Sequence, residues 1–265
     1  MHPTVNIATR AARAAGRILL RAMPQIDHLA VVEKRAHDFV SAVDREAEAE
    51  IIRVIRTAHP GHAILAEESG SRPGDDNEWI IDPLDGTSNY LRGIPHFAVS
   101  IAFRQLGRLE SAVVYDPLRE ELFTAARGRG AHLNDRRIRV SGRTALGDAI
   151  LGTGFPFRHR VYLDSYLASF RALLNDCGDI RRPGAAALDL AYVAAGRYDG
   201  FWELKLAPWD IAAGALLVQE AGGLVSDFAG GHDYLQSGNV VAATPKVFKA
   251  MLQRLHGCLP PTLQC

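Results

Sequence analysis

Residues 79–90 combine residue types that could bind a metal ion and a phosphate group. The apolar start of this segment, residues 79–81, predicts a short buried strand, and two carboxylates follow at Asp82 and Asp85. The Gly-Thr-Ser-Asn run at 86–89 is typical of a helix start. Hard cations prefer oxygen ligands, and phosphate binds backbone N–H groups at the start of a helix. One short segment could therefore supply both halves of a metal-assisted phosphate site.

Two further groups of acids could complete such a site. Glu67 and Glu68 follow a predicted short strand, and Asp210 opens a predicted helix. Taken singly, these acids also fit an N-cap at Asp210, a solvated loop at the glutamate pair, and a turn with an N-cap at Asp82 and Asp85. Taken together, they favour carboxylates that converge above sheet edges and bind two or three Mg²⁺ ions. A zinc site is less favoured, because the ten histidines do not recur at helical ligand spacing.

The composition is that of an ordinary globular protein of 265 residues, with 48% hydrophobic and 23% charged residues. Lys+Arg and Asp+Glu both number 30, and this balance argues against strong nonspecific binding to nucleic acid or to an anionic membrane surface. The three cysteines show neither metal spacing nor a disulfide framework, so a reducing cytoplasm is expected. No stretch approaches the roughly 18 apolar residues of a membrane span.

The spacing of apolar residues predicts helices at residues 5–22, 44–58, 162–175, 186–195, 210–221 and 245–256. Short apolar runs bounded by Gly and Pro predict strands at residues 63–65, 79–81, 97–103, 109–115, 121–126, 131–140, 150–154, 179–181, 198–203, 224–227 and 240–243. The polar stretches 33–38 and 69–77 are interpreted as connections, the first of them a mobile loop. This mixture of elements favours an α+β or layered α/β fold.

The chain resembles the inositol monophosphatase family in three motifs. Its Asp82-Pro-Leu-Asp85-Gly-Thr87 and Trp209-Asp210-x-Ala-Ala-Gly…Glu220-Ala-Gly-Gly223 runs are similar to the two signatures of that family, and residues 184–200 fit the segment between them. The resemblance extends from the first helix to about residue 256. It is strongest to the bacterial branch, of which residues 152–157 and the pair Arg181-Arg182 are typical. Some members of that branch also act in transcription antitermination and bind RNA polymerase.

The resemblance implies a five-layer α/β/α/β/α sandwich, with residues 1–145 and 146–265 as two halves, the active site between them, and a homodimer. It also implies a Mg²⁺-dependent, lithium-sensitive phosphatase that hydrolyses myo-inositol monophosphate. Two alternatives stay open at this point. One is a partner of RNA polymerase or elongation factors in transcription antitermination. The other is a phosphatase for a different small ester, such as a fructose bisphosphate, histidinol phosphate or adenosine bisphosphate.

Roles follow from the resemblance residue by residue. The implied ligands of a first Mg²⁺ are Glu67, Asp82 and the Leu84 carbonyl; those of a second are Asp82, Asp85 and Asp210; and a third ion would again use Glu67. Thr87 and Asp44 would orient the attacking water, as catalytic residues together with Glu67. The implied contacts to substrate come from Asp85, Gly86, Thr87, Ala186, Glu203 and Asp210, with Arg181 either near the substrate or in a structural salt bridge.

Some positions depart from the family pattern. Ala66 replaces a glycine, Ser88 a threonine, and Pro183 and Ala185 replace a threonine and a serine. Lys205 stands where a glycine is common, two residues after Glu203, where a cation could pair with that carboxylate or attract a second phosphate. These departures leave the metal ligands in place and bear on substrate preference.

Overall fold

The larger of two main β-sheets has eight strands in a computed structural model that describes residues 2–28, 31–35 and 38–264. Its strands are antiparallel to their neighbours except for the parallel pair β3 and β5. In spatial order they are β10 (Arg136–Ile138), β9 (Gly130–Leu133), β8 (Glu121–Ala126), β7 (Arg108–Asp116), β6 (Ala98–Gln105), β5 (Asn77–Asp85), β3 (Ala63–Ala66) and β4 (Gly70–Arg72).

The smaller main sheet has five strands and mixed pairing. In spatial order they are β12 (Asp179–Arg181), β11 (Ile150–Thr153), β13 (Gly200–Glu203), β15 (Val240–Ala243) and β14 (Leu224–Ser226). Strand β11 is parallel to both of its neighbours, whereas β15 is antiparallel to both of its own. The carboxyl ends of β11 and β13 therefore meet at one edge, where Gly154 and Glu203 line a cavity described below.

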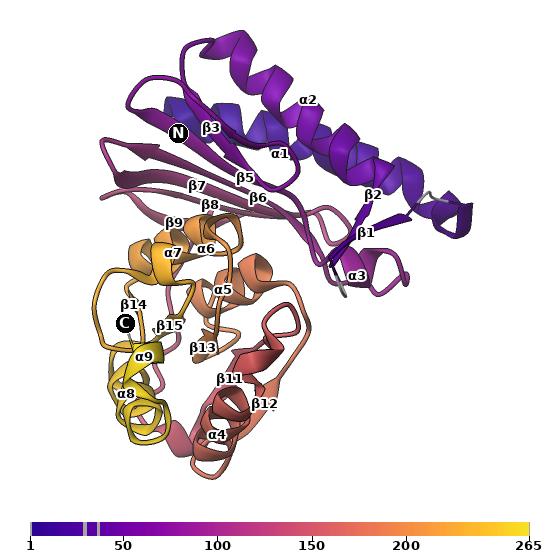
Figure 1. Ribbon diagram of the computed structural model, residues 1–265. Helices are drawn as coiled ribbons and strands as arrows, with labels where there is room; N and C mark the ends of the chain where they lie inside the picture. Colours follow the sequence, from indigo (N-terminus) through magenta and orange to yellow (C-terminus); the bar gives the residue numbers. More distant parts are fainter. Residues whose placement is uncertain (1, 29–30, 36–37, 265) are drawn as a thin grey trace.

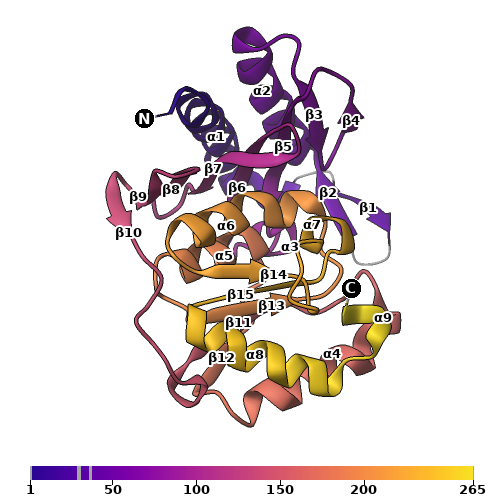
Figure 2. The ribbon, with the colours of Figure 1, turned by 90° about the vertical axis from the view of Figure 1, so that its left-hand side faces the viewer.

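Helices cover the sheets so that five layers alternate (Figures 1 and 2). Helices α1 (Pro3–Ala22) and α2 (Ala42–Ala58) lie on the outer face of the large sheet, and α5 (Ala186–Ala194) and α6 (Pro208–Glu220) lie between the two sheets. Helices α4 (Leu163–Leu174) and α8 (Pro245–Cys258) form the last layer. The predicted five-layer α/β/α/β/α architecture is confirmed. Shorter helices are α3 (Thr87–Tyr90), α7 (Tyr234–Ser237), α9 (Pro261–Gln264), η1 (Met23–His28), η2 (Leu146–Asp148) and η3 (Arg160–Tyr162).

The apolar pattern of each long helix matches its layer. Helix α1 buries one stripe that includes Val5, Ala12 and Leu19, as expected for a helix with one wet face. Helix α6 is apolar all round: every residue from 211 to 218 is buried, because sheets lie on both sides of it. Among the described residues, no helix is both long and apolar enough to cross a membrane.

The polar stretch 33–38, predicted to be a mobile loop, contains the ends of two paired strands instead. Strands β1 (Val31–Arg35) and β2 (Asp38–Ser41) are antiparallel, with Val32 opposite Val40, and residues 36 and 37 lie outside the described residues. The run of charges at 33–35 concealed the β-branched residues on either side of it. The loop prediction is therefore wrong for the described part of this stretch.

Other strand boundaries also differ from the prediction. The single strand predicted at 131–140 is the hairpin β9–β10, turning at Asn134 and Asp135, whose φ angles of 46° and 65° suit a tight turn of this kind. Strand β5 continues four residues past Ile81 to Asp85, and β4 lies within the predicted connection 69–77. Helix α6 begins at Pro208, so Asp210 is its third residue rather than its N-cap.

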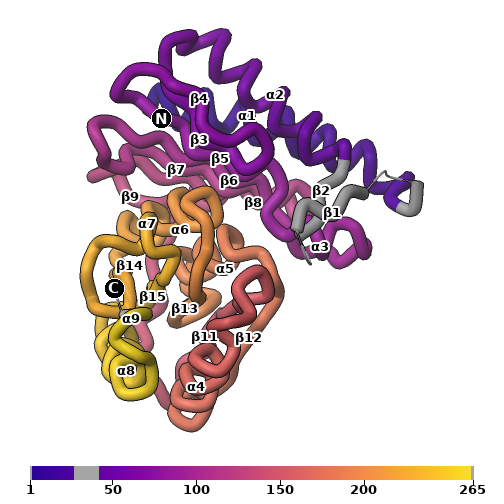
Figure 3. Tube along the Cα trace, in the orientation of Figure 1, coloured from indigo at the N-terminus to yellow at the C-terminus, as the bar shows by residue number. Residues whose placement is uncertain are grey.

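The division at residue 145 stays a prediction. The large sheet uses residues 63–138 and the small sheet residues 150–243, so the chain changes sheets at that place (Figure 3). However, helices α5 and α6 of the second half pack on strands β5, β6 and β7 of the first half. The layer that they form belongs to both sheets.

A cluster of aromatic rings closes one end of the large sheet. His62 stacks on His59 with ring centroids 4.2 Å apart, and its Nδ1 accepts the indole N–H of the fully buried Trp79 at 3.0 Å. Burial, followed by the neighbouring His59, lowers the pKa of His62. The imidazole must be neutral to accept the Trp79 hydrogen bond.

We expect His62 to make stability fall in acid. Because its pKa in the folded chain is lowered, its contribution is complete above the ordinary histidine pKa near 6.5 and is lost as the pH falls through the lowered value. Unfolding midpoints of wild type and His62→Gln, followed by tryptophan fluorescence from pH 8 to 5, should therefore draw together or cross as the pH falls. Replacement of the exposed His159 by Gln is the matched control. Parallel curves for wild type and His62→Gln would refute the assignment.

Candidate active site

Asp82 and Asp85 lie at the carboxyl end of β5, where the strand departs from regular pairing. Residues three apart in a regular strand point to opposite faces of a sheet. The register of β5 with β6 shifts between Asp82 and Asp85, across Pro83, and the Leu84 N–H donates to Asp82 Oδ1 at 2.9 Å. This irregular turn brings both carboxylates to the same cavity.

The starts of two helices meet these carboxylates. The Ala187 N–H in the first turn of α5 donates to Asp85 Oδ2 at 2.7 Å, so Asp85 caps a helix whose N-cap residue, Ala185, has no polar side chain. In α6, Asp210 Oδ2 accepts the Ala207 N–H at 2.7 Å. Ser100 lies opposite Asp82 in the sheet and donates to the carbonyl of residue 209 at 3.2 Å, which ties the start of α6 to β6.

The three aspartates form one buried cluster. Asp82, Asp85 and Asp210 each offer a carboxylate oxygen, and these atoms all lie within 4.8 Å of one another. Burial and nearby carboxylates, Glu67 first among them, raise the pKa of Asp82 well above its usual range. Burial, followed by the charge of Asp210, does the same to the pKa of Asp85. Such a set of oxygen-only donors fits a hard divalent cation such as Mg²⁺, which would relieve the repulsion between the charges.

Helix α2 positions two further residues of the site from the outer layer. Asp44 and Glu48 are four residues apart, so they share one helix face, and both are buried. The Glu48 carboxylate accepts the N–H groups of residues 68 and 69 at 2.7 and 2.9 Å, which fixes the turn that carries Glu67. Asp44 Oδ1 lies 3.2 Å from the Thr87 hydroxyl, which also lies 3.0 Å from the Leu84 carbonyl.

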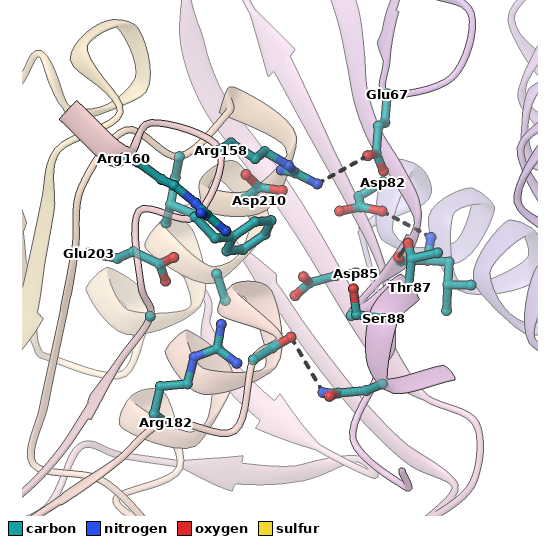
Figure 4. A pocket seen from close by; sticks show the side chains of 18 residues that line it. Glu67, Asp82, Asp85, Thr87, Ser88, Arg158, Arg160, Arg182, Glu203 and Asp210 are labelled. Atoms are coloured by element: carbon teal, nitrogen blue, oxygen red, sulfur yellow. Dashed lines mark hydrogen bonds and ion pairs between the residues drawn. The ribbon is translucent and has the colours of Figure 1, made fainter. Parts of the chain in front are cut away.

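A cavity of about 370 Å³ joins the predicted site residues (Figure 4). The predicted residues that line it are Glu67, Asp82, Leu84, Asp85, Gly86, Thr87, Ala186, Glu203 and Asp210. Asp44 does not line the cavity itself but contacts Thr87, which does. The structure does not bring Arg181 to the cavity: its guanidinium pairs with Asp179 at 2.5 Å on the exposed strand β12. Of the two alternatives for Arg181, the structure therefore agrees with the salt bridge. Arg182, not Arg181, lines the cavity.

Two glycines leave room for groups that approach the cavity. Gly86 has φ of 88°, and a Cβ there would lie 2.9 Å from the His96 carbonyl oxygen. A Cβ on Gly154 would lie 2.2 Å from both carboxylate oxygens of Glu203, so a larger residue at position 154 would displace that carboxylate. Burial, followed by the charge of Asp210, raises the pKa of Glu203 well above its usual range.

Sequence reasoning missed several residues of the site. Arg158 and Arg160 line the cavity, and Arg158 lies 3.8 Å from Glu67. Both follow directly after the motif at residues 152–157, so their position next to that motif was the available signal. Glu48 was missed as well, although its spacing of four residues from Asp44 in a predicted helix indicates a shared face.

Two family departures now have a structural description. Ala185 packs against the turn at Gly86, with its Cβ 3.2 Å from the place where a Gly86 Cβ would stand. Lys205 adopts a left-handed backbone with φ of 58°. Its Nζ lies 3.3 Å from the Ser237 carbonyl oxygen and over the Tyr162 ring, so the ammonium group contacts Ser237 and Tyr162.

Five alternating layers, with clustered carboxylates beside a Gly-Thr turn between the two sheets, define the class of layered α/β phosphatase folds. The family model for the inositol monophosphatase family matches residues 1–259, so the chain belongs to that family.

Relatives extend over the whole chain. The Nus factor SuhB of Pseudomonas aeruginosa is 58% identical over 270 residues, covering 100% of both chains. The crystal structure of extragenic suppressor protein SuhB from Bartonella henselae is 45% identical, with a TM-score of 0.93 over 96% of this chain and 98% of that one. The inositol monophosphatase from Anabaena is 38% identical, with a TM-score of 0.87 over 98% and 97% of the two chains.

We predict that Mg²⁺ stabilises this protein through the aspartate cluster. Ligand at 100 times its Kd stabilises a fold by roughly 2.7 kcal/mol, which corresponds to about 5–10 °C in Tm for a chain of this size. Thermal unfolding with and without Mg²⁺ should show this shift in wild type and in the exposed control Asp164→Asn, and little of it in Asp82→Asn.

The same experiment tests the charge repulsion without metal. Because the pKa of Asp82 is raised, its contribution to stability is present in acid and is lost as the pH rises through the raised value. At pH 7.5 in chelator, Asp82→Asn should therefore unfold at the same temperature as wild type or higher. If Asp82→Asn had a lower Tm than wild type in chelator and still showed the full rise in Tm with Mg²⁺, the result would argue against a cation site at Asp82.

Proposed function

We propose that this protein is a Mg²⁺-dependent phosphomonoesterase that hydrolyses myo-inositol monophosphate to myo-inositol and phosphate. The observation that carries the proposal is the convergence of Asp82, Asp85 and Asp210 within 4.8 Å, at a cavity large enough for a sugar phosphate. Membership of the inositol monophosphatase family supports the same activity. We further propose two or three Mg²⁺ ions, inhibition by lithium, and a homodimer in the cytoplasm.

The residues that would hold Mg²⁺ are Glu67, Asp82, Asp85 and Asp210 with the Leu84 carbonyl. Bound there, the metal would neutralise the phosphate dianion, activate water and stabilise the leaving oxygen. The chain itself holds these ligands rigidly, because each is fixed by a backbone hydrogen bond or a neighbouring element described above. A rigid ligand set suits Mg²⁺, which demands nearly ideal octahedral geometry.

Thr87 and Asp44 would orient the attacking water. The Thr87 hydroxyl is 3.2 Å from Asp44 Oδ1, so Thr87 can donate to Asp44 while its oxygen accepts a hydrogen bond from water. Asp44 is fully buried, so bulk water does not compete for this contact. The competing Leu84 carbonyl at 3.0 Å would be relieved of its hydrogen bond if it served as a metal ligand.

The opposite wall would bind the inositol ring. Glu203 is buried and aimed at the cavity above Gly154, where it can exchange hydrogen bonds with substrate hydroxyls (Figure 4). Ala186 at the start of α5 adds a small apolar surface for the ring. Gly86 and Thr87 would contact the phosphate through their backbone N–H groups.

Hydrolysis of inositol 1-phosphate tests the proposal. We expect turnover that requires Mg²⁺, is inhibited by Li⁺, and falls on the order of 10²–10³-fold in Asp82→Asn and in the nearly isosteric Thr87→Val, because each removes several kcal/mol of transition-state stabilisation. Asp164→Asn should keep wild-type turnover. Equal turnover in wild type, Asp82→Asn and Thr87→Val would refute the mechanism.

The preferred ester is a separate question. Fructose bisphosphate, histidinol phosphate and adenosine bisphosphate are compared with inositol 1-phosphate by kcat/KM on the same preparation. We expect inositol 1-phosphate to rank first. A higher kcat/KM for another ester would retain the metal mechanism and change the substrate.

A second candidate function is supported by the relatives. The chain is 58% identical over its full length to a protein named Nus factor SuhB, so we propose that it also takes part in transcription antitermination through RNA polymerase or elongation factors. This role and phosphatase activity are compatible. The exposed pair Arg181-Arg182, typical of the bacterial branch, is the first surface to test.

We expect purified RNA polymerase with elongation factors to retain the wild-type protein and Asp82→Asn in a pull-down. Arg182→Ala should be retained less, because it removes a cation from the exposed end of the site. Retention of none of the three proteins would count against the transcription role, whereas loss with Asp82→Asn alone would link binding to the metal site.

A further inference from the structure

We propose that the buried residues His96 and Asp189 act as a positioning pair. They hold the turn that carries Gly86 and Thr87 against helix α5 and thereby set the Mg²⁺ affinity of the site. The inference rests on the proposed function, because it concerns how that metal site is held. Neither residue lines the cavity. Both would therefore act through Asp85 and Gly86 rather than on substrate.

The pair is a close contact between two buried side chains from distant parts of the sequence. His96 Nε2 lies 3.3 Å from Asp189 Oδ1, and the side chains are 11% and 1% exposed. Among the described residues, neither atom has a partner that meets hydrogen-bond geometry, so the two make a close polar contact rather than an aligned hydrogen bond. A buried polar atom without a partner is costly, so this contact should hold the two side chains together.

On the first side, the backbone of His96 supports the turn at Gly86. The His96 carbonyl accepts a hydrogen bond from Asn89 Nδ2 at 2.8 Å, and Asn89 belongs to the short helix α3 that follows Gly86. The same carbonyl oxygen would be 2.9 Å from a Cβ on Gly86. A shift of His96 would therefore move the turn that carries Gly86 and Thr87.

On the second side, Asp189 lies in α5 just after the residue that binds Asp85. The Ala187 N–H donates to Asp85 Oδ2 at 2.7 Å, two residues before Asp189. The Asp189 N–H in turn donates to the Ala185 carbonyl at 2.9 Å, which closes the first turn of the helix. A displacement of Asp189 would therefore carry the N–H group that orients Asp85.

The two sides together define the function of the pair. Asn89 Nδ2 also donates to the Pro183 carbonyl at 2.9 Å, so a second link joins α3 to the segment before α5. The His96–Asp189 contact and this link therefore join the region of the Gly86 turn to α5 and to the segment before it. Because Mg²⁺ tolerates little deviation from octahedral geometry, a small shift of Asp85 should weaken metal binding before it unfolds the chain.

Other charged groups act on Asp189 as well. Arg182, Tyr198, Glu203 and Asp85 interact with it electrostatically, and the His96 ring packs edge-on against Tyr192 with centroids 5.9 Å apart. Burial raises the pKa of Asp189 to about 6, and His96 opposes that rise. The test therefore keeps the pH fixed and varies the pair itself.

The experiment measures Mg²⁺ affinity by calorimetry on the full chain, together with Tm in chelator. The variants are His96→Phe, Asp189→Asn, the double variant, and His96→Gln, which restores a donor near the original Nε2. The control is Asp199→Asn, a buried carboxylate that accepts the Ile150 N–H at 2.8 Å away from the cavity.

We expect each single disruption to raise the Mg²⁺ Kd about tenfold or more, the double variant to add little beyond either one, and His96→Gln to recover most of the affinity. Asp199→Asn should lower Tm and leave the Mg²⁺ Kd within about twofold of wild type. The proposal is overturned if the His96 and Asp189 variants lower only Tm, as the control does. If His96→Phe fails to fold, His96→Gln and Asp189→Asn still decide by their Kd values.

This test separates the two proposals. A protein that binds Mg²⁺ and responds to the pair, yet does not hydrolyse inositol 1-phosphate, would sustain the positioning role and refute the substrate. Hydrolysis of inositol 1-phosphate by a protein whose Mg²⁺ Kd is unchanged in the His96 and Asp189 variants would sustain the substrate and refute the positioning role.

Discussion

The repulsion between buried carboxylates at the end of β5 is the constraint on which the rest of the site depends. Asp82 and Asp85 are 1% and 9% exposed, and Asp210 brings a carboxylate oxygen within 4.8 Å of theirs. Buried like charges are costly unless protons or a cation neutralise them. The fold accepts this cost by giving each carboxylate a backbone N–H donor, and a divalent cation would remove most of what is left.

The layered architecture explains how so many acids reach one place. Outer helix α2 carries Asp44 and Glu48, strand β5 carries two aspartates, and middle helix α6 carries Asp210. Each of these three layers therefore contributes a different part of the site. The carboxylates also cap or anchor the elements that hold them, as Asp85 does for α5 and Glu48 for the turn after β3. The same side chains thus serve the fold and the chemistry.

Local patterns in the sequence were sufficient to predict much of the layered fold and the convergence of the carboxylates. The apolar stripe of α1 and the all-apolar α6 determine their layers, and the strand-then-acid order at residues 79–85 predicted that carboxylates would converge. The resemblance to a family supplied roles that spacing alone could not give. The predictions that were wrong also concerned local structure. The charged residues 33–35 led to a loop prediction for a strand pair, and the hairpin at Asn134 was predicted as one strand.

Long-range contacts could not be predicted from the sequence. Nothing in the chain near Arg181 or Arg182 indicates which of the two lines the cavity, because that depends on where the end of β12 lies relative to the site. The contact between His96 and Asp189 joins residues 93 positions apart and has no local signature. Glu48 likewise has meaning only once the turn after β3 is packed against α2.

The most direct test of the central claim is a crystal structure of the protein soaked in Mn²⁺, with anomalous diffraction used to locate the metal. We predict a peak among the carboxylates of Asp82, Asp85 and Asp210, at about the 2.0–2.2 Å typical of small hard cations bound by oxygen. A well-ordered cluster without a peak, in crystals that bind Mn²⁺ elsewhere, would contradict the assignment of this site as a divalent-cation centre.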